Sequence, residues 1–547
     1  MSLDTASIKG IIDLKTQDEI NRNSSKFKGL LLSNRDVAEQ ILGNRKAEST
    51  VRRVWKEYKQ KGHYRGVVGS APIAAGSIEN PIAKRRTLKG NKFVITSAQN
   101  NTHIHEDFFK SLLVYCEEEG AELLISNFYY NKNGFQNGAR EDSWFDKRIT
   151  PYLINESVQL AKGLVFNAEL NILPTARNPL SGFDTYNGDQ SGIVPHVKME
   201  LQPLPSPKFE EARALYTTGT ITKRNYIQQK AGQLAEWDHI FGALIVEIDE
   251  DGDWFVRQLH AESETGEFYD LTKKYTPKGV ISEEKEHYLA AIQYGDIHRD
   301  KLRKSVADMC WNSENSIAAT MKPEYAFLED IHDQARRNHH NMKDPYYLFK
   351  QFSSKKECIK DEVRLTVDLL QDLKKYNKNL VVVESNHDVA LERYLKEQDY
   401  RKDPVNALFF LEMQLENYKK MSEGEELQTF KTACEKVAEE GDLDRVAFLK
   451  TDESFRMLGI EMGSHGNTGN NGSRGSALSF RKQGIKYNIG HSHAPLIKGG
   501  VFQAGACVLV EDSGYATGGS SWAIGHIFTY PNGKRTMVVC KNGKWRG

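Results

Sequence analysis

Cysteine is scarce in this chain of 547 residues, and no two of its six cysteines form a CxxC pair. So few thiols argue against a disulfide framework, and the missing pairs exclude a zinc ribbon or a thioredoxin-type redox motif. No apolar run approaches the roughly 20 residues of a membrane-spanning helix. The first residues also lack the apolar core of a signal peptide. We therefore expect a soluble cytoplasmic protein with no membrane partner.

The chain also lacks net charge, because 74 basic residues balance 74 acidic ones. A zero sum argues against a nucleic-acid partner only if the charges are evenly spread. Residues 1–90 hold 18 basic and 9 acidic residues, so the rest of the chain carries an equal acidic surplus. The basic end is thus a candidate for binding DNA. A chain of this length suggests about three domains.

The basic N-terminal part, residues 1–62, has the pattern of two short helices. Ser33 and Asp36 have the spacing of a capping box, and Gly43 suits a left-handed helix end. Apolar residues at helical spacing over 51–58 predict the second helix. Two helices joined by a tight turn resemble a helix-turn-helix, a common DNA-binding motif. The basic side chains that would then face DNA are Arg45, Lys46, Arg52 and Arg53. The alternative is a helical assembly domain with a solvated basic face.

A linker and a second domain are predicted next. Residues 63–90 are rich in Gly, Ala, Ser and Pro, as linkers often are. In 91–280, Phe93–Thr96 and Leu123–Ile125 have the composition of buried strands, and Asp107–Glu119 between them has a helical pattern. We predict a middle α/β domain there, and its sequence indicates no activity.

From about residue 281 onward, a polar cluster follows a strand-like apolar run five times. Open α/β sheets place their sites at the carboxyl ends of strands. An Asp-x-His triplet alone means little, since about one is expected by chance, but Gly-His-x-His is much rarer. The five clusters are Gly295-Asp296-Ile297-His298, Glu329-Asp330-Ile331-His332-Asp333, Ser385-Asn386-His387-Asp388, Gly463-Ser464-His465-Gly466 and Gly490-His491-Ser492-His493.

The order of these clusters resembles the calcineurin-like metallophosphoesterase family, which has DxH, GDxxD, GNH[DE], a lone His and GHxH. The resemblance covers residues 281–547, about half of the chain, and implies an α/β metallophosphoesterase sandwich. Two family glycines are replaced, since Glu329 precedes Asp330 and Ser385 precedes Asn386. Both glycines serve tight turns, so the replacements leave the loop geometry open, while every ligand type is retained.

The resemblance implies two divalent metals, which activate a water and offset phosphate charge. One metal's ligands would be Asp296, His298 and His493, those of the other Asn386, His465 and His491, and Asp330 would bridge them. His387 would protonate the leaving oxygen, with Asp333 orienting it. The family suggests Mn²⁺, although these mixed ligands also suit Fe or Zn.

Together, the basic N-terminus and the ligand set predict a metal-dependent phosphodiesterase that hydrolyses DNA. The catalytic region is similar to the family branch that contains double-strand-break repair nucleases. The order of the parts is similar to that of pre-early proteins of T-five-like phages, which take part in degrading host DNA and would act in the host cytoplasm. One alternative is a protein phosphatase or nucleotide phosphodiesterase of the same fold. The other is a non-catalytic DNA-binding or assembly protein.

An insertion interrupts the predicted catalytic domain between two of its motifs. Residues 389–455 have a helical pattern, with helices expected over 390–396, 405–420 and 425–440. Such an insertion would either cap the site or form a contact in a homo-oligomer. The sequence favours neither.

Overall fold

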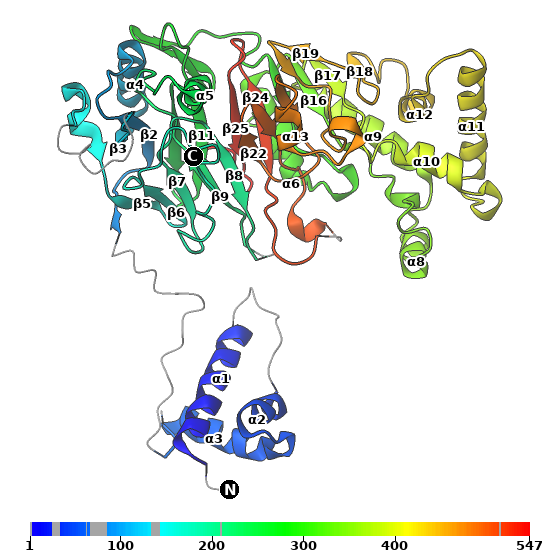
Figure 1. Ribbon diagram of the computed structural model, residues 1–547. Coiled ribbons are helices and arrows are strands. Elements are labelled where there is room, and N and C mark those ends of the chain that lie inside the picture. The colour runs from blue at the N-terminus through cyan, green and yellow to red at the C-terminus, as the bar shows by residue number, and fades with distance from the viewer. Residues whose placement is uncertain are drawn as a thin grey trace. The chain divides into compact units, whose positions relative to one another are not determined.

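The computed structural model describes residues 3–23, 33–61, 63–65, 85–132, 143–207, 210–513 and 516–547. They form two compact units, one within residues 1–83 and one within 84–547 (Figure 1). The first unit is helical, and the second is mixed α/β. The predicted linker, 63–90, falls largely on residues 66–84, outside the described residues. Within the described parts, no helix is both long and apolar enough to cross a bilayer.

The N-terminal unit contains α1 (Thr5–Asn23), α2 (Asn34–Leu42) and α3 (Glu48–Lys61). The capping box is confirmed, because Ser33 Oγ accepts from the Asp36 amide at 3.2 Å and Asp36 Oδ2 accepts from the Ser33 amide at 2.9 Å. Gly43 ends α2 with a φ of 61°. Both predicted helices are therefore confirmed.

The first helix, α1, was not predicted. Gly10 lies inside it, and glycine lowers helix propensity by about 1 kcal/mol relative to alanine. The space that Gly10 leaves is used, since a Cβ there would lie 3.0 Å from Ile41 Cδ1 of α2. Ile11 and Ile12 of α1 are fully buried against Val51 and its neighbours in α3. Tertiary packing thus stabilises a helix that its local sequence favours weakly.

The largest sheet of the second unit is mixed and has eleven strands among the described residues. In sheet order they are β1 (Arg86–Thr87), β5 (Ser157–Ala161), β6 (Leu164–Asn167), β7 (Ser191–Val194), β9 (Arg213–Thr217), β8 (Leu201–Leu204), β22 (Leu496–Lys498), β23 (Val501–Gln503), β21 (Lys486–Ile489), β20 (Ile460–Glu461) and β19 (Arg456–Met457). Leu201 of β8 pairs with Ile497 of β22. Strands from both sides of residue 280 thus share a sheet, and the domain boundary expected there stays a prediction.

A six-stranded sheet carries most of the polar clusters. Its order is β18 (Val446–Phe448), β17 (Asn379–Val382), β16 (Tyr325–Leu328), β15 (Ala291–Gln293), β24 (Gly525–Thr529) and β25 (Arg535–Val539). The first four strands are parallel. Residues that follow β15, β16 and β17 therefore meet at one edge of the sheet.

Both faces of this six-stranded sheet are covered. Successive side chains of a strand point to opposite faces, so two neighbours in β15 show what covers each face. Ile292 of β15 packs in the cluster that contains Val363 and Val367 of α9 (Ile359–Leu373). Its neighbour Ala291 packs in another cluster, with Ile460 of the large sheet. The sheet is thus held between helices and a second sheet.

A five-stranded sheet lies beside these, in the order β11 (Trp254–His260), β10 (Gly242–Ile248), β2 (Lys92–Gln99), β3 (Glu122–Phe128) and β4 (Leu153–Ile154). Strands β2 and β3 are parallel and joined by α4 (Glu106–Glu119). The predicted strand–helix–strand unit is therefore confirmed. A small sheet, β12 (Phe268–Asp270), β13 (Lys273–Thr276) and β14 (Gly279–Ile281), completes this region.

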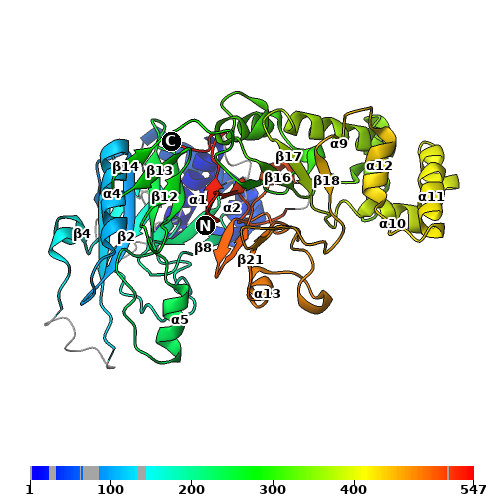
Figure 2. The ribbon, with the colours of Figure 1, turned by 90° about the horizontal axis from the view of Figure 1, so that it is seen from above.

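The insertion is helical, as predicted. Its helices are α10 (Ala390–Glu397), α11 (Ala407–Ser422) and α12 (Thr429–Val437). Figures 1 and 2 both show α11, in yellow, at the outer edge of the second unit. The remaining α-helices are α5 (Lys230–Asp238), α6 (Lys304–Ala307), α7 (Ile317–Met321), α8 (Pro345–Ser353) and α13 (Ala477–Arg481).

A buried ion cluster joins the five-stranded and three-stranded sheets. The Arg257 side chain, 2% exposed, donates to Asp270 Oδ1 and Oδ2 at 2.8 and 2.9 Å, and also to Glu247. Tyr115 of α4 donates to Asp270 as well, at 3.1 Å. Lys92 Nζ also lies 3.0 Å from Glu247 Oε1, so Arg257 and Lys92 together offset the two buried carboxylates.

We predict that Arg257→Met strongly destabilises the second unit, because Asp270 loses the guanidinium that binds it and Glu247 keeps only Lys92. The expected loss is about 3–5 kcal/mol of unfolding free energy, the usual effect of breaking a buried pair. The urea midpoint measured by circular dichroism checks it. The matched control is Arg401→Met, since Arg401 pairs with Asp399 on the surface. Equal midpoints for the two variants would contradict the prediction.

Candidate metal centre

Four of the predicted ligands converge on one point. His298 Nε2 lies 2.9 Å from His493 Nε2 and 3.5 Å from Asp330 Oδ2. His493 Nε2 lies 3.1 Å from Asp296 Oδ2. All four side chains are buried, and each offers a ligand atom within 4.8 Å of the others. Clusters far apart in the sequence thus meet at the edge of the six-stranded sheet.

Of the other three predicted ligands, His465 lies beside Asp330 and His491 lies beside His465, while Asn386 directly follows Ser385. His465 Nε2 is 3.5 Å from Asp330 Oδ1, on the side of Asp330 away from His298. The rings of His465 and His491 are in edge-to-face contact, with centroids 5.2 Å apart. The Ser385 side chain, directly before Asn386, helps to hold the pKa of the Asp330 carboxyl below its usual value. Asp330 therefore lies between the two ligand groups, where a bridging residue is expected.

The backbone of the site is strained. Positive φ angles occur at His298 (46°), Asp330 (48°), His491 (71°) and His493 (58°). For residues other than glycine, such conformations cost on the order of 1–3 kcal/mol each and gather at functional sites. Four of the seven predicted ligands have them. The fold holds these side chains in place at the expense of local stability.

Many polar atoms of the cluster are buried without a hydrogen-bond partner among the described residues. They are both Asp296 oxygens, Asp330 Oδ1, Asn386 Oδ1, both His465 nitrogens and His493 Nδ1. A buried unsatisfied polar atom costs about 1–3 kcal/mol, and more if it is charged. A cation would satisfy several of them at once. Imidazole, carboxylate and amide donors together fit a divalent transition metal, so these groups could bind metal ions.

The electrostatics of the cluster also favour a cation. Burial raises the pKa of the Asp330 carboxyl, but His465, His387 and His298 outweigh burial and hold that pKa below its usual value. Burial lowers the pKa of His465, but Asp330, Glu329 and Asp296 outweigh it and raise the pKa overall. The carboxylates thus favour positive charge at His465, which a bound dication would supply.

Asp333 has a different main partner from the one expected. Asp333 Oδ1 is 2.8 Å from His298 Nδ1 and 2.8 Å from Lys301 Nζ. Its distance to His387 Nδ1 is 3.5 Å, longer than a good hydrogen bond. Asp333 therefore orients the predicted ligand His298 most directly. The His387 side chain is 25% exposed, so a substrate can reach it.

Comparison with known proteins gives the relationship of the chain. Over 488 residues it is 42% identical to Protein A1 of Escherichia phage T5, an alignment that covers 87% of this chain and 86% of that protein. The chain belongs to the Protein A1 family. No protein-family model matches the chain, and no solved structure matches it.

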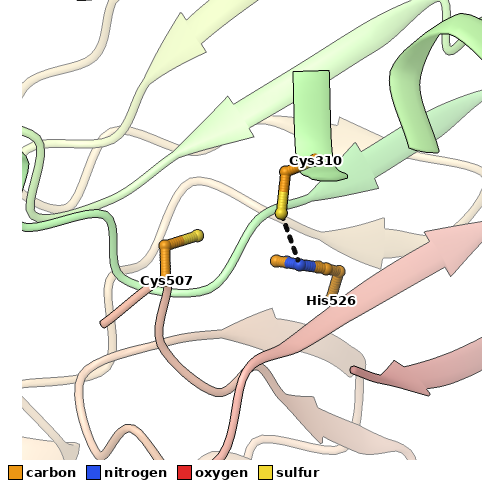
Figure 3. Close-up of side chains that lie close together, drawn as sticks. All are labelled: Cys310, Cys507 and His526. Atoms are coloured by element: carbon orange, nitrogen blue, oxygen red, sulfur yellow. Dashed lines mark hydrogen bonds between the residues drawn. The ribbon is translucent and has the colours of Figure 1, made fainter. Parts of the chain in front are cut away.

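This Protein A1 relative has a second group of side chains that lie close enough together to hold a metal ion. They are Cys310, Cys507 and His526 (Figure 3). The Gly295 amide donates to His526 Nδ1 at 3.1 Å, so the ring proton is on Nε2, 3.3 Å from Cys310 Sγ. Cys507 Sγ donates to the Gly295 carbonyl at 3.3 Å. Burial also raises the pKa of the Cys310 thiol. The group thus suits hydrogen bonding that holds Gly295, next to Asp296, better than metal binding.

The predicted DNA-contacting residues of this Protein A1 relative lie on the N-terminal unit. Arg45 pairs with Asp36 at 3.1 Å, and Arg52 pairs with Glu48 at 3.4 Å. Both arginines stay more than 60% exposed. Lys46 and Arg53 are exposed and have no ion pair with any residue that the structure describes. Their role in DNA binding stays a prediction.

In the sequence, Glu329 stands out only as a departure from the metallophosphoesterase motif pattern. The structure buries its side chain completely, in a group with Asp296 and His465. An ionisable residue where the metallophosphoesterase pattern has glycine is the one signal in the sequence that this position has a functional role.

Proposed function

We propose that this member of the Protein A1 family is a two-metal phosphodiesterase that hydrolyses DNA. The main support is the set of buried, unpartnered ligand atoms at the ends of parallel strands. The proposal includes the metallophosphoesterase sandwich implied by the order of the motifs. Its support is a parallel sheet packed between helices and a second sheet, with the clusters at one edge.

The residues fit two divalent ions, for which Mn²⁺ is the first choice and Fe or Zn the others. Such ions supply an activated water and offset the charge of a phosphodiester. The first ion would be held by Asp296, His298 and His493, the second by Asn386, His465 and His491, and Asp330 would contact both. Asp333 Oδ1, which also accepts from Lys301 Nζ, bonds His298 Nδ1 and so fixes the direction of the other ring nitrogen.

His387 is the proposed general acid. It is adjacent to the ligand group, with its ring centroid 4.9 Å from that of His298, and it is partly exposed. The pKa of His387 is lowered overall, by burial first and also by the positive charge of His298 and Lys301, although Asp330 and Asp333 favour its protonated form. A proton held there can pass to the oxygen that leaves phosphorus. Asp333 would thus serve both His298 and His387.

DNA is the proposed substrate because the N-terminal unit presents exposed basic side chains on a helix and on the turn before it. Arginine and lysine contacts to phosphates supply most of the affinity of non-specific DNA binding. The order α2, tight turn, α3 has the form of a helix-turn-helix. This unit would bring DNA to the catalytic unit.

The direct test is incubation of the purified chain with plasmid DNA and Mn²⁺. We expect cleavage that stops when the metal is chelated. A phosphorylated protein and a cyclic nucleotide should be assayed in parallel. Turnover of either substrate without plasmid cleavage would favour the phosphatase or nucleotide phosphodiesterase alternative. No turnover of any of the three substrates would favour the non-catalytic DNA-binding protein.

We predict that His387→Ala lowers DNA cleavage about 10²–10⁴-fold, the usual contribution of a general acid, while two metals still bind. Asp330→Ala should abolish cleavage and reduce metal uptake, since it removes the shared ligand. Cleavage rates and metal content by elemental analysis check both. Loss of metal from His387→Ala would show that this residue is structural.

We predict that Lys46→Gln with Arg53→Gln weakens DNA binding at every sequence and reduces its dependence on salt. Each lost phosphate contact should lower the slope of log affinity against log salt by about one. The rate on a small chromogenic diester should not change. The control is Lys396→Gln with Arg401→Gln, which removes two exposed positive charges from the second unit. Equal effects of both pairs would contradict a DNA-binding N-terminal unit.

A further inference from the structure

Glu329 occupies a position where the metallophosphoesterase pattern has glycine, and its carboxyl lies inside the ligand cluster. The side chain is fully buried. Its Oε1 accepts a hydrogen bond from Gln293 Nε2 at 2.8 Å, which holds the group in one orientation. Its Oε2 has no hydrogen-bond partner among the described residues. A buried carboxylate oxygen of this kind needs a donor or a cation nearby.

Gly490 makes the room for this carboxyl. A Cβ at residue 490 would lie 1.8 Å from Glu329 Oε2 and 2.3 Å from Asp296 Oδ1. The Gly490 amide donates to the His465 carbonyl at 2.7 Å, so this loop lies against the loop of His465. Gly490, in the last motif, thus leaves room for the Glu329 carboxyl, which stands in the second motif where the metallophosphoesterase pattern has glycine.

The two nitrogens of His465 face two different carboxylates. Nε2 is 3.5 Å from Asp330 Oδ1, and Nδ1 is 3.5 Å from Glu329 Oε2. Glu329 Oε2 and His465 Nδ1 are both without a hydrogen-bond partner among the described residues, and they face each other. We propose that Glu329 is a positioning residue: the two atoms would close to a hydrogen bond when a metal binds Nε2, as contacts at sites without their ligand often tighten on binding. Carboxylates that bond the far nitrogen of a ligating histidine fix its tautomer and orientation. This inference rests on the proposed metal centre.

The test is Mn²⁺ binding measured by calorimetry, without any substrate. Glu329→Ala should weaken one of two bound ions about 10–100-fold, the usual effect of losing such a partner. Glu329→Gln keeps an acceptor oxygen and should recover most of that affinity. Glu200→Ala is the control, because Glu200 is a buried glutamate that pairs with Lys498 outside the cluster. Thermal unfolding of each variant reports any general loss of stability.

The outcomes separate this inference from the proposed function. Two ions bound with unchanged affinity in Glu329→Ala would overturn the role of Glu329 and leave the metal centre intact. Absence of Mn²⁺ binding by the unmodified chain would overturn the metal centre and this role with it. An equal loss of Mn²⁺ affinity in Glu200→Ala would show that the weaker binding of Glu329→Ala comes from lost stability of the fold and not from a role of Glu329 at the metal.

A second inference comes from the outer helix of the insertion. Helix α11 buries Phe409, Phe410 and Met413. Its opposite face exposes a row of large apolar side chains, Leu408 (72%), Leu411 (46%), Leu415 (55%) and Tyr418 (64%). Their spacing of three, four and three residues is that of a coiled-coil seam. Contiguous apolar rows of this kind mark interaction surfaces.

We propose that α11 pairs with α11 of a second copy of this chain, in antiparallel orientation. With the row at the a and d positions of a heptad, Glu412 and Lys419 both fall at e. In an antiparallel pair, e positions face each other, so Glu412 of one copy would meet Lys419 of the other. Within one chain, Glu412 now lies 3.4 Å from Lys436 and Lys419 lies 3.3 Å from Glu416, and the pairing would add to these contacts or replace them. In a parallel pair the e positions would face the uncharged g residues Ala407, Gln414 and Met421. The charges therefore favour the antiparallel self-pair.

Sedimentation at micromolar concentration tests this pairing. We expect a dimer for the full chain, monomers for Leu411→Glu with Leu415→Glu, and an unchanged dimer for the control Leu234→Glu, which alters an exposed leucine of α5. Glu412→Lys should weaken the dimer at least several-fold, and adding Lys419→Glu should restore it. A monomeric unmodified chain, or a dimer unaffected by the leucine changes, would overturn the proposal.

Discussion

The main physical constraint on the second unit is a group of polar atoms that are buried without hydrogen-bond partners at the end of a parallel sheet. Asp296 and Asp330 are within a few ångströms of each other, out of contact with water, and their oxygens lack enough protein donors. Like charges so close repel strongly at low dielectric constant. The carboxylates raise the pKa of His465 and His298, and the protonated form of either ring would relieve part of this repulsion in the protein alone. A dication would relieve it more completely, and that need is the physical basis of the proposed metal centre.

The surrounding fold serves to hold these groups. Three parallel strands bring Asp296, Asp330 and Asn386 to one edge, and the loop at 490–493 returns from the other sheet to complete the set. Positive φ angles at four ligands are tolerated because the backbone on both sides is well bonded. For example, the His298 amide donates to the Asp330 carbonyl at 2.8 Å. The Cys310, Cys507 and His526 group holds Gly295 in the same way. Local strain is thus balanced by packing farther away.

Much of the site could be predicted from motif order, because each ligand follows a strand and strand ends meet. The short polar clusters indicated Asp296, His298, Asp330, His465 and His493, which the structure brings together. The partner of Asp333 could not be predicted, since the choice between His298 and His387 depends on differences below 1 Å. Nor could the place of Glu329, because the glycine that makes room for it is 161 positions further along the chain.

Local patterns were enough to predict the capped helices of the N-terminal unit with clear apolar spacing, the strands around 93 and 123, and the types of the predicted ligands. These depend on interactions within a few residues. Long-range packing, by contrast, sets three features: α1 forms around Gly10, strands from both sides of residue 280 share one sheet, and Glu329 faces His465. Each of these depends on atoms distant in the sequence, whose meeting is set by packing and leaves no local pattern.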